Sequence, residues 1–315
     1  MVCKHQNGIK IDEGSIRMIN KNQIGLVILL LFIMVNVVFA SETSPLRGWY
    51  PNLGVGVRAL GMGGAYTAIA NDPSGPQWNP AGLCQVQAGK IDWMHSDLYG
   101  INIKYGYIGG AFDLSKAGRT GFFIKRLDAS PAFNFPYDEY TIALCKAKQY
   151  LSPKFGRIQI GVNMKYMPFE AESDRYSVKA YGLGVDAGIL IRKGKLRFAS
   201  VIADPFTVIK GTKYYQGADA GKVEERLEPQ LIFGMAFVPD LTWRFAVDAE
   251  KKASGVVWRM GLEHWVNDNI AWRIGLNDNN IAAGFGIGLG RYEFNYAYQQ
   301  GGFGNTHRIG VAFQL

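Results

Sequence analysis

A repeated alternation of apolar with polar or small residues limits most strongly how this chain can fold. In residues 308–315, each second residue from Ile309 to Leu315 is apolar, and the residues between them are Arg, Gly, Ala and Gln. Successive side chains of a β-strand point to opposite faces, so this pattern predicts a strand with one apolar face. The same alternation recurs in residues 158–165, 183–189, 241–248, 270–276, 281–289 and 291–299.

The start of the chain has the pattern of a secretory signal peptide. Lys21 lies in a short polar stretch, residues 24–35 are almost wholly apolar, and Val38-Phe39-Ala40 offers small or branched residues at the cleavage site. A transmembrane anchor is the alternative, but the apolar stretch is shorter than the ~20 residues that a helical span needs. We therefore predict a signal peptide over residues 1–40, with Met18 as an alternative start.

Two all-β architectures fit such strands: a soluble sandwich with its apolar faces inward, and a membrane barrel with its apolar faces toward lipid. Repeated Arg, Lys, Asp and Asn on the second face argue against a dry sandwich core. The chain also has 39 Gly, 16 Tyr, 18 Phe and 7 Trp, which suit a barrel wall and its interfaces with water. With the signal peptide, these features predict a transmembrane antiparallel β-barrel that spans the outer membrane many times and has membrane lipid as a partner.

The number of strands follows from spacing. After residue 89, about fourteen strands of ~9–11 residues with short connections fit the chain, and twelve are tolerable. We expect long outward-facing loops at residues 128–135 and 205–225, and tight turns at 239–240, 267–268 and 277–279. The predicted strands begin near Lys90, Ile101, Arg119, Tyr137, Phe155, Tyr176, Lys195, Pro229, Leu241, Val256, Ile270, Asn280, Arg291 and Thr306.

Charge and cysteine content exclude several function classes. The net charge is +8, but it is scattered without a run of Lys or Arg, so no nucleic-acid partner is indicated. Cys84 and Cys145 are too few and too far apart for a disulfide framework, and we interpret them as two small buried thiols. No Cys and His spacing matches a metal site, and we predict neither a metal nor a cofactor.

Residues 41–88 lack the alternation of a wall strand. Prolines 73, 76 and 80 prevent a regular ladder, and the glycines of residues 54–64 allow tight turns and close backbone approach. These glycines do not complete G-x-G-x-x-G, and no βαβ unit follows, so a dinucleotide site is not indicated. We predict a plug over residues 41–88 and a barrel over residues 89–315.

Residues 58–83, RALGMGGAYTAIANDPSGPQWNPAGL, resemble the start of mature PorV/PorQ-type outer-membrane proteins, within the FadL-like superfamily of transporters of long-chain fatty acids and other hydrophobic compounds. This resemblance implies a fourteen-stranded barrel with an N-terminal hatch. Two departures stand out: the mature chain is short for a fatty-acid transporter, and it ends in Leu315 where such barrels usually end in an aromatic residue. The resemblance assigns the hatch to Arg58, Gly61, Gly63, Gly64, Asn71, Asp72, Trp78, Asn79, Pro80 and Ala81.

Two side chains of this segment have predicted roles of their own. Asn79 precedes a proline, which holds it in an extended or turn conformation, and its amide can bond to backbone groups on two sides. We predict that Asn79 pins the plug. Trp78 could either seal the lumen or line a ligand pocket, and we favour the seal.

The resemblance implies two function classes. The first is transport of a hydrophobic, fatty-acid-like small molecule across the outer membrane. The alternative is a PorV/PorQ-like shuttle or scaffold of a protein secretion system, with secreted proteins as partners. The sequence does not decide between them.

Residues 95–97, His-Ser-Asp, are the only candidate catalytic group, and they argue against an enzyme. A nucleophilic serine needs a base within hydrogen-bond reach, and neighbours on a strand point to opposite faces. His264 and His307 are single histidines near strand ends. We therefore predict no catalytic function.

A set of charged residues falls on the polar face of the last strands. Buried charges require partners, so we expect them to pair with one another and with the plug; a polar conduit is the alternative. The candidates are Arg244, Asp248, Arg273, Glu293 and Arg308, with Arg259 and Glu263 beside them.

Overall fold

The computed structural model describes residues 17–18, 53–113, 118–252 and 255–315. The predicted signal peptide and residues 41–52 of the predicted plug lie outside this part, except for the two-residue strand β1 (Arg17–Met18), which pairs in parallel with β5. No helix within the described ranges is long and apolar enough to cross a membrane.

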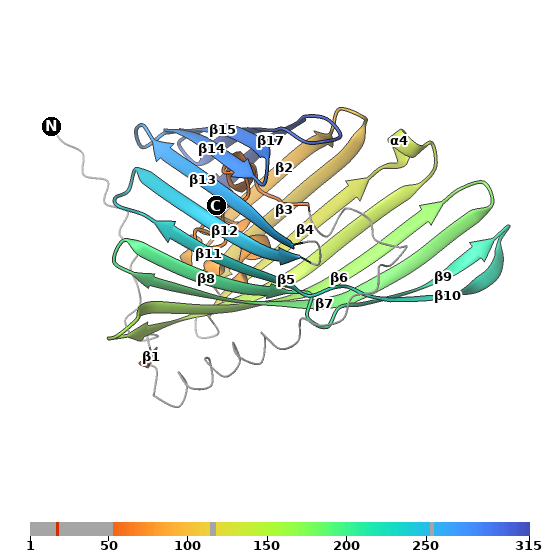
Figure 1. Ribbon diagram of the computed structural model, residues 1–315, viewed down its shortest axis with the longest axis horizontal. Helices are drawn as coiled ribbons and strands as arrows, with labels where there is room; N and C mark the ends of the chain where they lie inside the picture. Colours follow the sequence, from red (N-terminus) through yellow and green to blue (C-terminus); the bar gives the residue numbers. More distant parts are fainter. Residues whose placement is uncertain (1–16, 19–52, 114–117, 253–254) are drawn as a thin grey trace.

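Fourteen antiparallel strands form a closed barrel (Figure 1). The barrel closes where the last strand pairs with the first, from His307 opposite Asp97 to Gln314 opposite Lys90. The predicted fold class is confirmed, and each predicted strand begins within two residues of its observed start. The wall strands are β2 (Lys90–Leu98), β3 (Ile103–Asp113), β4 (Arg119–Asp128), β5 (Tyr137–Ser152), β6 (Gly156–Glu172), β7 (Tyr176–Lys193), β8 (Leu196–Ala203), β11 (Gln230–Phe237), β12 (Trp243–Lys252), β13 (Gly255–Trp265), β14 (Ile270–Asn277), β15 (Asn280–Leu289), β16 (Tyr292–Gln299) and β17 (Thr306–Gln314).

Residues 205–225 correct one prediction, because most of this expected loop is a hairpin of β9 (Val208–Tyr215) and β10 (Ala218–Arg226). Residues 186–193 of β7 pair with β8, and residues 176–183 of the same strand pair with β9. The hairpin therefore extends the sheet beyond the wall, to the right in Figure 1. The other expected loop contains the short helix α4 (Ser130–Phe133).

The two ends of the barrel differ. Short turns connect strands at the end where β17 finishes, whereas α4 and the β9–β10 hairpin lie at the opposite end (Figure 1). We call these the turn end and the loop end. Outer-membrane barrels have short turns on the periplasmic side and longer loops on the extracellular side, so the loop end faces the outside of the cell.

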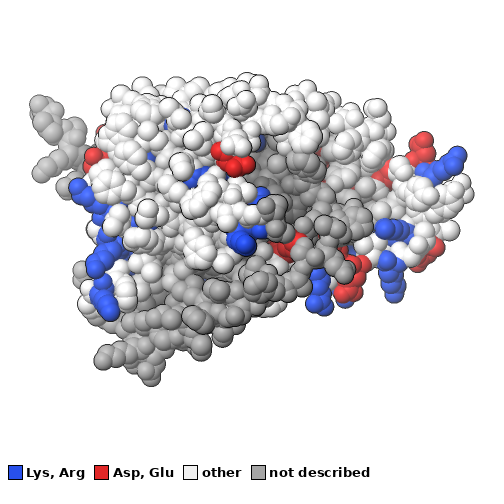
Figure 2. Space-filling model, viewed as in Figure 1, with Lys and Arg blue, Asp and Glu red and all other residues white. Residues whose placement is uncertain are grey.

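The outer face of the wall is apolar. Leu144, Met164 and Leu183, on three adjacent strands, are each at least 60% exposed. Figure 2 shows charged side chains gathered toward the two ends of the visible face, with mostly uncharged side chains between them. Such a belt is favourable against lipid and unfavourable in water.

Residues 53–88, which we call the luminal segment, lie inside the wall. They contain α2 (Val57–Gly61), α3 (Gly75–Trp78) and the 3-10 helix η3 (Pro80–Gln85). Apolar side chains of this segment, among them Met62 and Leu83, are fully buried against the inner faces of the strands. The core of the molecule is therefore the contact between this segment and the wall.

Inward-facing glycines make this contact possible. A Cβ atom at Gly275 would lie 2.1 Å from the backbone of Gly63, and one at Gly161 would lie 2.3 Å from the backbone of Pro80. No side chain fits at either position, since real Cβ atoms do not approach backbone so closely. The luminal segment packs directly on the wall at these two points.

Candidate functional site in the lumen

The most heavily charged contact between the luminal segment and the wall centres on Glu263 of β13, which is fully buried. Arg58 donates to it twice, from Nε at 2.6 Å and from Nη2 at 2.7 Å. Arg273 Nε donates at 2.8 Å, and Arg244 Nη1 lies 3.0 Å from the same carboxylate. The Glu263 carboxylate thus binds one arginine of the luminal segment and two arginines of the wall.

The network continues around the wall to β2. Arg273 Nη1 donates to Asn295 at 2.8 Å, and the Asn295 amide donates to Glu293 at 3.1 Å. Glu293 also pairs with Lys90, with 3.2 Å between Nζ and Oε2. Of the five lumen candidates predicted from the sequence, Arg244, Arg273 and Glu293 are therefore brought into one network.

Asp248, the fourth candidate, lies apart from that network and fixes the backbone of the luminal segment. Its Oδ2 accepts the backbone N–H groups of Tyr66 and Thr67, both at 2.9 Å. Tyr66 in turn donates its hydroxyl to Asp72 at 2.6 Å. Burial raises the pKa of Tyr66 well above its ordinary value, although nearby Arg58 opposes this, so the phenol keeps its proton and remains a donor.

The predicted hatch residues Arg58, Asn71 and Asp72 meet in space. Arg58 Nη1 donates to Asn71 at 2.8 Å and lies 3.5 Å from Asp72. Asp72 also accepts hydrogen bonds from Ser74, from its backbone N–H at 3.0 Å and its hydroxyl at 2.6 Å. These contacts fold the segment back on itself before it reaches α3.

Asn79 joins the luminal segment to itself and to the wall. Its amide donates to the carbonyls of Thr67 at 3.0 Å and Ile189 at 3.2 Å, and its Oδ1 accepts the Ala81 N–H at 2.9 Å. Pro80 starts η3, where a missing N–H costs nothing. Such hydrogen bonds are those expected of a side chain that holds the plug against the wall.

The three predicted hatch glycines lie where the segment touches the last strands. Gly63 and Gly64 have φ of 67° and 78°, a conformation that glycine adopts without strain. A Cβ atom at Gly61 would lie 3.3 Å from Gly284 Cα, and one at Gly63 would lie 2.6 Å from the Leu276 carbonyl oxygen. Gly61 and Gly63 therefore let two backbones meet, whereas a Cβ atom at Gly64 would lie 2.9 Å from the ring of Trp78.

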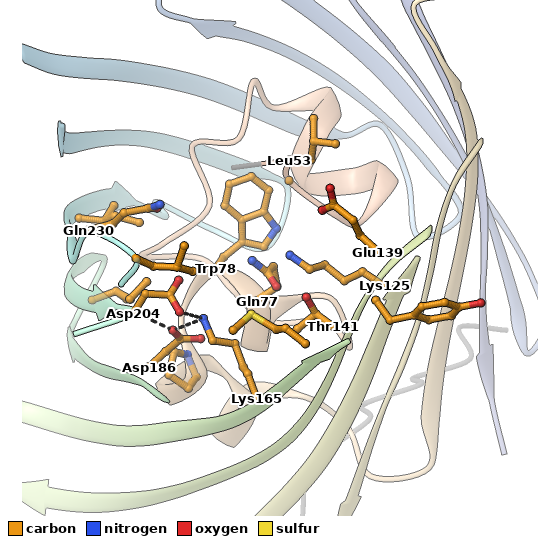
Figure 3. Close-up of a pocket in the computed structure, with 18 of the residues that line it drawn as sticks. Leu53, Gln77, Trp78, Lys125, Glu139, Thr141, Lys165, Asp186, Asp204 and Gln230 are labelled. Atoms are coloured by element: carbon orange, nitrogen blue, oxygen red, sulfur yellow. Dashed lines mark hydrogen bonds and ion pairs between the residues drawn. The ribbon is translucent and has the colours of Figure 1, made fainter. Parts of the chain in front are cut away.

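Toward the loop end the lumen is hollow. A partly enclosed cavity of about 120 Å³, which we call the mixed cavity, lies between the luminal segment and strands β4 to β9 and β11 to β13 (Figure 3). Its apolar lining includes Met167, Phe169, Val201, Ile209 and Ile232.

The charges around the mixed cavity are largely compensated. Lys165 Nζ lies 2.7 Å from Asp186 and 2.6 Å from Asp204, shown as dashed lines in Figure 3. On the other side, Arg259 pairs with Glu250. Lys165, Asp186 and Asp204 were not predicted as site residues. Lys165 and Asp186 nevertheless fall on the polar faces of two successive predicted strands.

Trp78 separates the mixed cavity from a second one. Its indole N–H donates to the Val55 carbonyl at 2.9 Å, and its ring lines both cavities. The second cavity, which we call the amide cavity, has a volume of about 250 Å³ and lies under the loop-end connections of β14 to β17 and β2. Arg308, the fifth lumen candidate, lines the amide cavity.

The side chains of residues 95–97 alternate across β2, as their spacing predicts. His95 is exposed on the outer face, whereas Ser96 is 2% exposed and faces inward, so the two side chains point to opposite sides of β2.

A closed fourteen-stranded wall, an apolar outer belt and a luminal segment packed inside the wall together define an outer-membrane β-barrel. Solved structures share this fold. The Ralstonia pickettii toluene transporter TbuX matches with a TM-score of 0.55 and 11% identity over 82% of this chain and 97% of that chain. The Pseudomonas putida toluene transporter TodX matches with a TM-score of 0.52 and 11% identity over 82% and 96%.

A third structure, the CymD monoaromatic hydrocarbon channel, has a TM-score of 0.52 and 13% identity over 83% of this chain and 98% of that chain. No protein-family description and no curated protein matches the sequence. At these identities the likeness establishes the fold, and the ligand has to be argued from the lumen of this chain.

Proposed function

We propose that this protein transports a small hydrophobic molecule across the outer membrane, and that the mixed cavity is where the molecule binds. The observation that carries the proposal is a space in the outward half of the lumen whose lining surface is mostly apolar, although charged side chains also line it. Binding sites for small molecules are concave and mostly apolar, with few polar groups.

The size and charge of the mixed cavity favour an uncharged ligand. Apolar cavities on the order of 150 Å³ bind benzene, and the mixed cavity has about 120 Å³. Lys165 and Arg259 already pair with acids of the wall, so neither attracts a carboxylate strongly. These features support a molecule about the size of one aromatic ring over a fatty acid. The named substrates of two similar barrels, TbuX and TodX, are consistent with this choice.

The exit route follows from the sheet. The mixed cavity reaches Ile209 and Leu227, next to the point where β7 changes partner from β8 to β9. Residues 184 and 185 of β7 have no partner strand in either ladder. We propose that a molecule in this cavity leaves through the wall at this branch rather than through the packed luminal segment.

The test is a substitution that fills the cavity. Ala203 lines it, so Ala203→Trp should occupy the space and weaken binding of radiolabelled toluene to the purified barrel at least tenfold. The matched control is Ala218→Trp at the exposed tip of the β9–β10 hairpin, which should bind as the unaltered protein does. Equal toluene binding by both variants, with both folded, would refute the proposal.

The alternative function is a shuttle or scaffold for secreted proteins, like PorV and PorQ. The β9–β10 hairpin favours it, because this hairpin extends beyond the wall and presents exposed polar side chains. A barrel that binds no toluene, but retains a defined exported protein only while this hairpin is present, would select the alternative.

A further inference from the structure

Arg308 differs from the other buried arginines that the sequence placed in the lumen. Arg244 and Arg273 share Glu263. Arg308 is 5% exposed, and its Nε and Nη1 atoms have no hydrogen-bond partner. No carboxylate in the described part of the chain pairs with it.

An uncompensated guanidinium in this position is costly. Burying a charge without a partner is unfavourable, and an arginine cannot escape the cost by losing its proton. A desolvated ionisable side chain that lines a cavity is a candidate for a ligand site. The side chain lines the amide cavity, so an anion that entered there could reach it.

The rest of the amide cavity has the chemistry of a hydrophilic site. Its lining is rich in side-chain amides, each of which both donates and accepts hydrogen bonds and so suits hydroxyl groups. Aromatic rings stand at its edge, and Tyr99 and Phe303 pack edge to face with centroids 6.0 Å apart. The amides are those of Asn277, Asn280, Gln299 and Gln300.

We propose that Arg308 and the amide cavity form a second binding site, which takes a small hydroxylated carboxylate. The Arg308 side chain lines the cavity and would give the carboxylate a charge-assisted hydrogen bond, and the amides would hold the hydroxyls. The space of about 250 Å³ equals roughly eight water molecules at about 30 Å³ each, enough for a sugar acid. This site lies across Trp78 from the mixed cavity and does not depend on the proposed transport of hydrophobic molecules.

The experiment compares two ligands that differ in one group. D-Gluconate and sorbitol have the same carbon chain and hydroxyls, but only gluconate has a carboxylate. Calorimetric titration of the purified barrel in neutral detergent, at constant ionic strength, should show binding of gluconate and at least tenfold weaker binding of sorbitol. Equal affinity for the two would overturn the proposal.

Variants locate the site. Arg308→Met should lose gluconate binding and, without ligand, should be at least as heat-stable as the unaltered protein, because it removes an uncompensated charge. Gln300→Leu, at an exposed amide of the lining, should fold normally and weaken gluconate binding severalfold. Arg291→Met, at an exposed turn-end arginine, is the control and should change neither.

Two results would overturn the assignment. The first is gluconate binding unchanged by Arg308→Met and Gln300→Leu. The second is a large loss of heat stability in ligand-free Arg308→Met, which would give Arg308 a purely structural role. Toluene binding in the mixed cavity should survive Arg308→Met, so failure of one site is distinguishable from failure of the other.

Discussion

The two halves of the lumen use the same kinds of residues to opposite effect. In the half toward the turn end, inward glycines such as Gly161 and Gly188 lie directly against Pro80 and Asn79 of the luminal segment. In the half toward the loop end, the same alternating strands enclose the mixed cavity and the amide cavity. The alternation of the strands determines only that polar and small side chains face inward. Whether these side chains pack against the luminal segment or line a cavity depends on how that segment is folded.

Glu263 and Arg308 show the difference at single residues. Both are buried and inward-facing, on β13 and β17. Glu263 has Arg58, Arg244 and Arg273 around it, and its environment is complete without a ligand. Arg308 has a cavity instead. Removing Glu263 would leave three arginines without this partner, whereas on our proposal the partner of Arg308 is a ligand.

Glu263→Gln should have the largest effect of any single change in the packed half. It would leave Arg58, Arg244 and Arg273 sharing no carboxylate at that position, and breaking a buried ion pair from one side costs ~3–5 kcal/mol. The midpoint of urea unfolding, followed by the shift in gel mobility between folded and unfolded barrel, measures this loss.

The control for Glu263→Gln is an ion pair outside the lumen. Lys179 and Glu170 lie 2.6 Å apart but are 63% and 49% exposed, near the loop end. Exposed pairs contribute ~0–1 kcal/mol, so Glu170→Gln should leave the midpoint nearly unchanged. If both substitutions shifted the midpoint equally, the packed half would not depend on its charge network.

Gly275→Ala should have the next largest effect. Its new Cβ atom would lie 2.1 Å from the backbone of the luminal segment, whereas at Gly288 on the next strand the nearest atom would be 3.6 Å away. Overpacking costs ~1–3 kcal/mol or more, so Gly275→Ala should unfold at clearly lower urea than Gly288→Ala. Equal midpoints would mean that the segment shifts freely on the wall.

The wall was predictable from sequence because lipid imposes its pattern on every strand. An apolar residue such as Ile309 must alternate with an inward one such as Arg308, and the repeats of this pattern give the number of wall strands. The β9–β10 hairpin was not predicted, because lipid does not impose this pattern on it. Most of it lies beyond the wall, where lipid does not cover one face, and its strands carry no such regular alternation.

The candidate site was predictable only in part. The motif in residues 58–83 singled out Arg58, Asn71 and Asp72, which meet in space. Periodicity placed Arg273 and Arg308 on the inward face. It does not predict that Arg273 pairs with Glu263 and that Arg308 lines a cavity. A cavity is space that no side chain fills, and this depends on how the luminal segment is folded rather than on any residue pattern.

The smallest effect concerns thiol reactivity, which separates the two halves without changing stability. Cys145 is 1% exposed, whereas Cys84, which lies in η3 of the packed half, is only partly buried, so the prediction of two buried thiols is wrong for Cys84; both are free thiols. Burial raises the pKa of the Cys84 thiol to about 12, although Arg119 opposes this. At pH 8 a thiol of that pKa is ionised on the order of once in ten thousand molecules, and the thiolate is the reactive form.

Met167→Cys places a thiol in the mixed cavity of the hollow half. An ordinary cysteine with a pKa near 8.5 is about a quarter ionised at pH 8, so Met167→Cys should react with a small maleimide at least a hundredfold faster than Cys84. Since the folded protein favours the protonated Cys84, its labelling should rise as the pH increases from about 9 toward 12, and the stability that it contributes should fall over the same range. Mass spectrometry of the labelled sites measures both rates. Rapid labelling of Cys84 at pH 8 in the folded barrel would show that the luminal segment leaves the wall, and the contrast between a packed and a hollow half would not hold.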